Sequence, residues 1–425
     1  MNNQEEKIIG SENPQTAMEA KAQKKPVYKN RFFWGAASLV LVCAVVLTAL
    51  HFVPGVNLFG TTAATKTDKA PLVSGNAKDV FNAINADSGK PEKVDVNFNA
   101  RSADSDIDSY FANHIQGYAK YYGVGGDFHI FSYSNVVGKQ GYVWFVSKDN
   151  SKRFYMKFNP TAMFDQDVLQ SNYNHPTGLQ VVGDYWAVSV IPAGFGPYFN
   201  KASITYIVDL SELKNKTSDG GKGQEISLPY STVKDLTHSM YVQELENKPS
   251  KIVDTAGGDA GSLSAVGITS LDKGYMIALI AGSTVVVYTT ENDNLLDSCN
   301  AGNYTLKTTY SVKYNNNVGN FQGIGLFRDT ATKDVYMVGF DRRNRTEDWA
   351  DLFRLTENGK LVTGSEINGF KNVIAPFENT VKHCYLRGGA GFEYGSGIEI
   401  WSGKLYLTGT ESYAKDGNAT INIMR

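Results

Sequence analysis

Five segments of this 425-residue chain repeat one pattern of three short runs, and this repeat constrains the fold more than any other feature. Each segment begins with small, glycine-containing residues, continues with a nearly unbroken apolar run, and ends with a more alternating run. Runs of this length between Gly, Asn and Asp are typical of β-strands, so we expect an all-β domain. The first runs start at residues 114, 177, 265, 321 and 389. The second runs are Phe128–Tyr133, Tyr185–Ile191, Tyr275–Ile280, Val335–Phe340 and Leu405–Thr408, and the third runs are Tyr142–Ser147, Ile204–Leu210, Thr284–Thr290, Asp351–Leu355 and Ala419–Met424.

The repeat resembles that of a β-propeller, in which blades of antiparallel strands are arranged radially. Neighbouring blades cover the second strand on both faces, which accounts for the unbroken apolar runs. The innermost strands converge on the axis, where small residues fit, and this accounts for Gly117, Gly178, Gly267, Gly323 and Gly391. The resemblance covers about residues 94–425 and predicts a five-bladed propeller, with six blades as the alternative.

The last repeat supplies three strands before the chain stops at Arg425, whereas Val94–Phe98 alternates apolar and polar residues and belongs to no repeat. An unpaired strand edge is prone to aggregate. The sequence therefore predicts that residues 94–98 pair with residues 419–424 and complete the last blade. The propeller domain is then residues 93–425.

An apolar stretch of 22 residues, Phe32–Val53, precedes this domain and contains no Lys, Arg, Asp or Glu. As a helix it would span ~33 Å, enough to cross the hydrocarbon core of a bilayer. Lysines and an arginine lie before it and no charge follows until Lys66, which places the N-terminus in the cytoplasm. We therefore expect a disordered cytoplasmic tail (1–31), a transmembrane helix (32–53), a stalk (54–92) with a short helix at 76–86, and a periplasmic or extracellular domain. A cleaved signal peptide is the alternative, although the apolar run exceeds the about 7–15 residues usual for one.

Charge and cysteine content exclude some classes of function. The chain has 41 basic and 43 acidic residues, which is no footprint of nucleic-acid binding, so we expect no nucleic-acid partner. The basic run Arg342-Arg343-Asn344-Arg345 is flanked by acids, and we interpret it as a solvated turn rather than an anion site. Cys299 and Cys384 allow one disulfide in an oxidising compartment, or two free thiols.

Standard catalytic and cofactor motifs are absent from the sequence. It contains no Gly-x-Ser-x-Gly, P-loop, His-Glu-x-x-His or Cys-x-x-Cys motif. Asp104, Asp106 and Asp108 imitate the start of a calcium loop, but the glycine and glutamate that such a loop requires are missing. We therefore predict no cofactor and no metal.

Polar side chains near the starts of the innermost strands are the candidate ligand-binding residues. Amide and imidazole groups at a channel mouth recognise polar ligands such as sugars. The alternative is that they hydrogen-bond neighbouring strands and channel water. The set is His114, Gln116, His175, Gln180, Gln322 and Arg387. Phe195, Tyr198 and Phe199, in a loop after a second strand, are candidates for stacking on a sugar or for contact with a partner protein.

Two classes of function follow from these observations. The first is a membrane-anchored binding or assembly module that holds a protein or glycan partner at a propeller face. The alternative is an extracytoplasmic carbohydrate-active hydrolase, which needs two carboxylates about 5–10 Å apart in the funnel. The acids nearest the inner strands are Asp127, Asp184, Glu393 and Glu399, and none of them stands in a motif. The sequence therefore favours binding over catalysis.

Overall fold

The structure is a computed structural model that describes residues 69–87, 91–96, 113–135, 140–158, 175–191, 204–217, 223–233, 263–281, 284–314, 317–318, 321–343, 347–367, 370–414 and 417–425. Most of these residues lie in strands. The strands are β1 (Glu92–Asp95), β2 (Asn113–Gly123), β3 (Gly126–Asn135), β4 (Gln140–Ser147), β5 (Arg153–Lys157), β6 (His175–Val182), β7 (Tyr185–Ile191), β8 (Ile204–Asp209), β9 (Gly223–Glu225), β10 (Tyr230–Val233), β11 (Leu263–Ser270), β12 (Tyr275–Ala281), β13 (Thr284–Thr290), β14 (Tyr304–Tyr314), β15 (Asn317–Val318), β16 (Gly323–Arg328), β17 (Val335–Arg343), β18 (Glu347–Arg354), β19 (Thr356–Glu357), β20 (Lys360–Leu361), β21 (Ser365–Ile367), β22 (Phe370–Ile374), β23 (Val381–Cys384), β24 (Ala390–Trp401), β25 (Lys404–Glu411) and β26 (Asn418–Met424). The helices are α2 (Ala77–Ala83), α5 (Leu295–Asn300) and the 3-10 turns η4 (Ser211–Asn215) and η5 (Phe377–Asn379).

The strands pair in an order that runs outward from β2, β6, β11, β16 and β24. The orders are β2-β3-β4-β5-β9, β6-β7-β8-β10, β11-β12-β13-β14-β22-β21, β16-β17-β18-β23 and β24-β25-β26-β1. The second and third of these are joined by one parallel pair between Gly178 and Ala265, and β19 pairs with β20 on its own.

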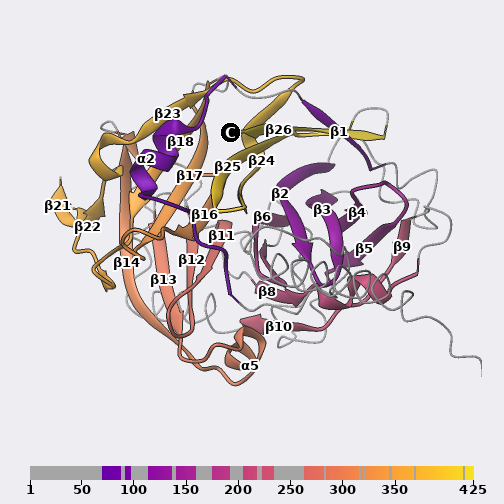
Figure 1. Cartoon of the computed structure of the whole chain (residues 1–425), viewed down its shortest axis with the longest axis horizontal. Helices are drawn as coiled ribbons and strands as arrows, with labels where there is room; N and C mark the ends of the chain where they lie inside the picture. The colour runs from indigo at the N-terminus through magenta and orange to yellow at the C-terminus, as the bar shows by residue number, and fades with distance from the viewer. Residues whose placement is uncertain are drawn as a thin grey trace, which may run out of the picture. The chain divides into compact units, whose positions relative to one another are not determined.

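Within the described residues, the innermost strands contact one another in a closed cycle. β2 contacts β6, β6 contacts β11, β11 contacts β16, β16 contacts β24, and β24 returns to β2. In Figure 1 these strands lie around the centre and the later strands of each sheet lie further out. The expected all-β fold, a β-propeller, is therefore confirmed.

Glycines let the innermost strands approach one another at the axis. A Cβ on Gly117 would lie 2.9 Å from the backbone nitrogen of Leu179 on β6, and one on Gly397 would lie 2.7 Å from the carbonyl oxygen of Tyr118 on β2. Both separations are too short for a side chain. Gly391 differs from the sequence interpretation, because it lies against side chains of β17 and β18 rather than at the axis.

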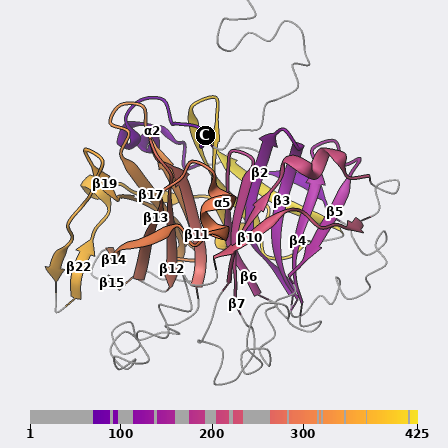
Figure 2. The same ribbon diagram turned by 90° about the horizontal axis from the view of Figure 1, so that it is seen from below.

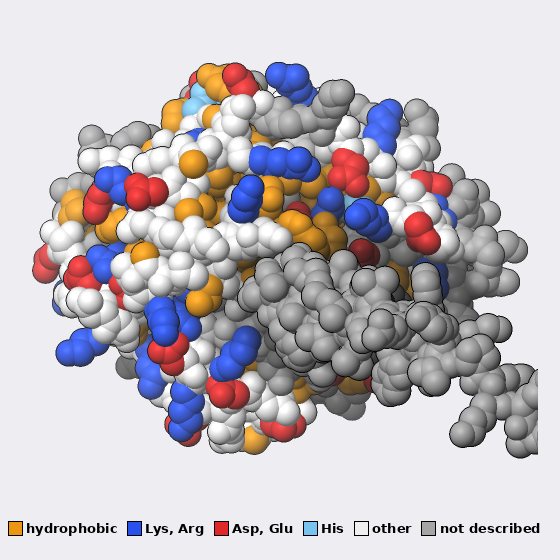
Figure 3. All heavy atoms as spheres, in the orientation of Figure 1, with side chains coloured by type: hydrophobic (Ala, Val, Ile, Leu, Met, Phe, Trp, Pro, Cys, Tyr) orange, Lys and Arg blue, Asp and Glu red, His pale blue; other side chains and the backbone are white. Residues whose placement is uncertain are grey.

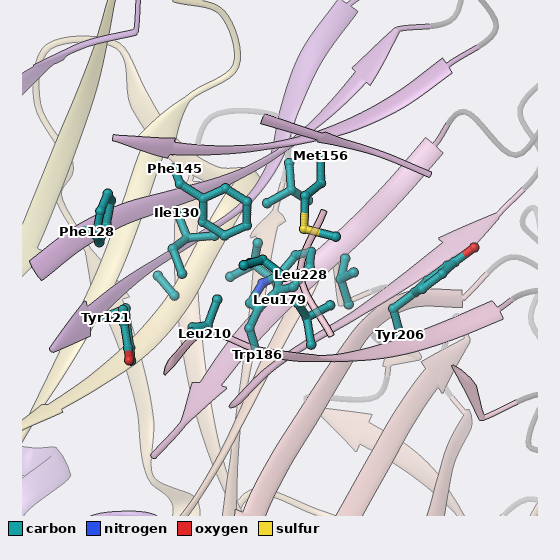
Figure 4. Close-up of a cluster of buried hydrophobic side chains, with 14 of the residues drawn as sticks. Tyr121, Phe128, Ile130, Phe145, Met156, Leu179, Trp186, Tyr206, Leu210 and Leu228 are labelled. Atoms are coloured by element: carbon teal, nitrogen blue, oxygen red, sulfur yellow. The ribbon is translucent and has the colours of Figure 1, made fainter. Parts of the chain in front are cut away.

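The second strands are buried on both faces, which is the physical reason for their unbroken apolar sequence. Alternate residues of β12 enter two different hydrophobic clusters: Tyr275, Ile277 and Leu279 pack in one, and Met276, Ala278 and Ile280 in the other. Figure 4 shows a third cluster, in which Phe145 and Ile130 of one sheet lie near Trp186 and Leu179 of the next.

The two ends of the domain meet in one sheet. β1 lies antiparallel to β26, with Val94 opposite Ala419 and Asp95 opposite Asn418. The paired strand starts at Glu92, earlier than the stretch chosen from the sequence, and residues 97 and 98 lie outside the described residues. Arg153 on β5 holds the same strand from its other side, because its guanidinium bonds the Asp95 carboxylate at 2.6 Å.

The interpretation of residues 54–92 as a stalk is wrong for residues 69–87, which pack on the propeller. Helix α2 is capped by Asn76 and buries Phe81 completely. Val73 donates a backbone hydrogen bond to Arg328 on β16, and the backbone nitrogen of Ala77 bonds an Asp329 carboxylate oxygen. In Figure 2, α2 lies at the upper end of the strands.

The predicted tail and transmembrane span, residues 1–31 and 32–53, lie outside the described residues. Among the helices that the structure describes, none has the length and apolarity needed to cross a membrane.

The structure decides between the two alternatives for the cysteines and corrects the interpretation of the basic run. Cys299 and Cys384 are free, buried thiols in different hydrophobic clusters, so the disulfide does not form. The basic run is not a solvated turn at its first two residues, since Arg342 bonds Glu393 at 3.1 Å and Arg343 bonds Asp351 at 2.5 Å. Carboxylates therefore pair with Arg342 and Arg343, the two arginines of the run that the structure describes.

Candidate functional site

His114 and His175 lie side by side at the starts of β2 and β6. Their ring centroids are 5.3 Å apart in an edge-to-face arrangement, and Nδ1 of His175 lies 3.0 Å from the hydroxyl of Ser134. Burial lowers the pKa of His114 to about 4 and that of His175 to about 3, with the neighbouring His114 adding to the second shift. Both rings are therefore neutral at pH 7.

Gln180 lies further along β6 than His175, among the residues that line the pocket described below, and its amide also has a structural role. Its amide oxygen accepts hydrogen bonds from the backbone nitrogens of Ile268 and Leu326, at 2.9 Å and 2.8 Å. Its amide nitrogen donates to the carbonyl oxygen of Leu326 at 2.7 Å. One side chain from β6 thus joins β11 and β16. This agrees with the second interpretation of the polar residues in the sequence analysis, that they hydrogen-bond neighbouring strands.

The other predicted residues do not form one group with the histidines. Gln116 is buried at a bulge in β2, and Gln322 is half-buried immediately before β16. Arg387 is exposed, and its backbone exchanges hydrogen bonds with the Asn422 side chain on β26. Phe195, Tyr198 and Phe199 lie outside the described residues.

A pocket of about 510 Å³ opens at the opposite ends of the innermost strands. Its walls come from the carboxyl-terminal parts of β2, β6 and β24, from β16, and from the segment Lys69–Pro71. Figure 3 views the face that carries this segment, and lysine or arginine side chains lie beside hydrophobic ones near its middle. The lining itself combines charged residues, such as Lys120 and Glu399, with apolar ones, such as Ile398 and Trp401.

Two aromatic rings form one side of the pocket. Tyr122 at the end of β2 and Trp401 at the end of β24 have ring centroids 4.5 Å apart and planes tilted by 45°. Trp401 keeps 49% of its surface exposed, which is unusual for so large an apolar side chain. Rings of this kind offer an apolar face together with a polar edge, and they are common in recognition sites.

Lys120, on β2, is one of the two lysines among the described residues that line the pocket. Its ammonium nitrogen lies 3.1 Å from a carboxylate oxygen of Glu92, and the other oxygen of Glu92 lies 3.6 Å from Nε2 of His129. The positive charge of Lys120 is therefore matched by a partner from β1, the strand that joins the two ends of the domain.

Glu399 is a second carboxyl group near the same lysine. Burial raises the pKa of Glu399, while Lys120 and a hydrogen bond with the Tyr122 hydroxyl oppose part of that shift. Its Oε2 atom is buried and has no hydrogen-bond partner among the described residues. A buried acceptor without a partner is costly for the fold.

Of the acids singled out from the sequence, Glu399 lines the pocket and the others do not. Asp184 is buried and accepts hydrogen bonds from the Tyr121 hydroxyl and the backbone of Val124, Glu393 is bound to Arg342, and Asp127 is exposed.

Sequence reasoning missed Lys120, Tyr122 and Trp401. One signal was present, because Trp401 directly precedes a Ser-Gly turn, where a large aromatic side chain is not expected to be buried.

The fold and the site together define a β-propeller with an aromatic, charged pocket at one end of its innermost strands. No family model matches the sequence, and no curated protein matches it. Solved structures similar in fold include an exo-1,5-α-L-arabinanase from a bovine ruminal metagenomic library. The two chains are 10% identical, the comparison covers 74% of this chain and 93% of that chain, and the TM-score is 0.39.

Two other structures are similar at the same level. The catalytic domain of the Coprinopsis cinerea GH62 α-L-arabinofuranosidase has 8% identity over 84% of this chain and 98% of that chain, with a TM-score of 0.39. Trypanosoma rangeli sialidase has 10% identity, with 79% of this chain and 60% of that chain covered, and its TM-score is 0.31. Similarities this low carry no argument about the activity of the present chain.

Proposed function

We propose that this protein is a membrane-anchored, extracytoplasmic β-propeller that binds a glycan in the pocket between Lys120, Tyr122, Glu399 and Trp401. The observation that carries the proposal is the half-exposed Trp401 next to Tyr122 in the lining of a pocket. Aromatic rings stack on the apolar face of a sugar, while carboxyl and ammonium groups bond its hydroxyls. The pocket volume suits a small ligand or the end of a chain.

The finer parts of this proposal rest on separate observations. The closed cycle of β2, β6, β11, β16 and β24 supports a propeller of five blades. The apolar stretch of residues 32–53, with basic residues before it, supports an anchor whose N-terminus is cytoplasmic. A protein partner at a propeller face is the other binding hypothesis, and a glycan is preferred because the pocket is concave.

Binding is tested by calorimetric titration of the full-length protein, held in lipid nanodiscs, with a panel of neutral, acidic and amine-bearing oligosaccharides. We expect at least one sugar to bind, and Trp401→Ala to weaken it by about tenfold or more, because truncating a central aromatic contact typically costs over 1 kcal/mol. Tyr385→Ala is the matched control, since Tyr385 is 54% exposed and lies outside the pocket lining. Absence of binding to every sugar, or equal binding by the Trp401 variant, would contradict the proposal.

A second candidate function is hydrolysis of a glycan. The observation in its favour is Glu399, because a buried carboxyl group with a raised pKa is suited to act as a general acid. A hydrolase of this type needs a second carboxylate, and Glu399 is the one acid among the described residues that line the pocket. Release of reducing sugar by the wild type and its loss in Glu399→Gln would establish hydrolysis, and no release from any sugar that binds would exclude it.

A further inference from the structure

We infer that the glycan bound in this pocket carries a carboxylate beside Lys69, so that the pocket selects acidic sugars over their neutral counterparts. This inference rests on the proposed glycan-binding function and adds the chemical class of the ligand.

The charge that a ligand can reach in the pocket is the first argument. The charged lining residues among those described are Lys69, Lys120 and Glu399. Glu399 is not the group that a ligand meets, because its Oε2 atom is buried and both Lys120 and Arg425 act on its charge as cations. Lys120 keeps 12% of its side chain exposed, whereas Lys69 keeps 45%. The most accessible charge of the lining is therefore the ammonium group of Lys69.

The surroundings of Lys69 are the second argument, because bases outnumber acids there. Asp293 accepts a hydrogen bond from Lys69 at 2.7 Å. Asp272 accepts one from Arg328 at 2.9 Å. These bonds lower the pKa of both carboxyl groups, and two exposed lysines add to the shifts, one to each. This rim, among the described residues, thus has four bases and two acids: Lys69, Lys273, Arg328 and Lys333, with Asp272 and Asp293.

Two further acids lie close to these bases in the sequence, and neither removes the excess of positive charge. Asp334 is paired with Arg354 at 2.6 Å. Asp329 is completely buried and accepts hydrogen bonds from the backbone nitrogens of Ala77 and Thr332. Even when Asp329 is counted, the bases outnumber the acids, so an added anion is favoured over an added cation at this rim.

The ion pair of Lys69 is suited to exchange with a ligand, which is the third argument. Lys69 and Asp293 are both about half exposed, and exposed ion pairs contribute little to stability. Asp293 also accepts a hydrogen bond from the backbone nitrogen of Gly274 at 2.8 Å, so it keeps a partner when Lys69 turns toward a ligand. The backbone nitrogen of Ala70 bonds the Ser270 hydroxyl at 2.9 Å, which holds the chain next to Lys69 at the edge of the pocket.

The aromatic pair is the fourth argument, because it lines the same pocket as Lys69. A cavity of about 510 Å³ is small enough for one short oligosaccharide to contact both. The rings of Tyr122 and Trp401 offer surface for the apolar face of a sugar, and the ammonium group of Lys69 offers a charged hydrogen bond. A uronic acid carries an apolar face and a carboxylate on one sugar ring and can use both.

The experiment compares two oligosaccharides of equal length that differ only in the charge of their carboxyl groups. Full-length protein in nanodiscs of zwitterionic lipid is titrated with a galacturonate oligomer and with its methyl ester at low ionic strength. We expect the acid form to bind about tenfold or more tightly, in line with a charged hydrogen bond. Added salt should weaken binding of the acid form and leave that of the ester unchanged.

Variants of Lys69 assign the preference to this residue. Lys69→Gln should bring the ratio of the two dissociation constants close to one, whereas Lys69→Arg, which keeps the charge, should retain most of the preference. Lys371→Gln removes an exposed lysine of β22 outside the pocket lining and should leave the ratio unchanged.

Each result separates this inference from the function beneath it. Equal or tighter binding of the ester, or a preference that survives in Lys69→Gln, overturns the inference and leaves glycan binding intact. Absence of binding to every acidic sugar, when neutral sugars of the panel bind, does the same. Absence of binding to every sugar overturns the inference and the proposed function together.

Discussion

Gln180 is a single residue whose side chain connects three of the innermost strands. Replacing it with alanine leaves two backbone donors and one acceptor, on Ile268 and Leu326, without their partner inside the propeller. We predict a loss of about 3 kcal/mol in the free energy of unfolding, because unsatisfied buried polar groups cost about 1–3 kcal/mol each and part of that cost relaxes. Chemical denaturation measures it, with Gln224→Ala as an exposed control on β9. An unchanged midpoint would show that the amide is dispensable.

The lowered pKa of His175 leads us to expect that the stability of the domain depends on pH. Its folded-state pKa of about 3 lies below the ordinary value of 6.5, so the unfolded chain takes up a proton first as the pH falls. The stability that depends on the neutral ring is complete above pH 6.5 and is lost progressively as the pH drops from there toward 3. We therefore expect His175→Asn to flatten the fall of unfolding free energy between pH 6.5 and 4. Identical slopes for variant and wild type would contradict this assignment.

At the scale of elements, helix α2 belongs to the folded domain although it precedes the first repeat. Phe81 is completely buried among side chains of the sheet that contains β16 and β17. Phe81→Ala should cost about 3–5 kcal/mol, as is usual when a buried phenylalanine is truncated. Asn82→Ala, at the exposed neighbouring position, should cost much less. Equal melting temperatures for the two variants would mean that α2 does not stabilise the domain.

Strand β1, the first strand that the structure describes, pairs with the last one, β26. Val94 is buried opposite Ala419, whereas the adjacent Lys93 is exposed. Val94→Asp places a charge without a partner in the core and should destabilise the domain by about 3 kcal/mol or more. Lys93→Asp introduces the same aspartate at an exposed position and serves as the control. Thermal unfolding that is equally affected in both variants would show that burial at Val94 is not the cause.

At the scale of the whole molecule, the membrane topology is a prediction from charge alone. The basic residues lie before the apolar stretch of residues 32–53, so the propeller should face away from the cytoplasm. Protease added to intact cells or spheroplasts should then remove the propeller and leave a short N-terminal fragment, detected with a tag at residue 1. A protected propeller, digested only after lysis, would reverse the orientation.

Some residues of the site were accessible to sequence reasoning and others were not. His114 and His175 were placed together because both start innermost strands, and the closed ring brings such positions close. Gln180 was assigned to the same mouth, but it lies further along β6 and its amide is taken up by backbone groups of two other strands. Hydrogen bonds between distant segments leave no periodic pattern, so the sequence offered no means to separate these roles.

By itself the sequence determined the class of fold and the positions of most strands, because apolar periodicity and glycine-rich turns are local properties. The tertiary structure alone decided the pocket, since Tyr122 and Glu399 come from β2 and β24, strands near opposite ends of the domain that meet where the ring closes. It also decided that residues 69–87 pack on the propeller, although Val73, Ala77 and Phe81 recur at every fourth position. The residues around this apolar face are polar or glycine, so the sequence did not reveal the face. Its role in packing became clear only from the propeller side chains that it contacts.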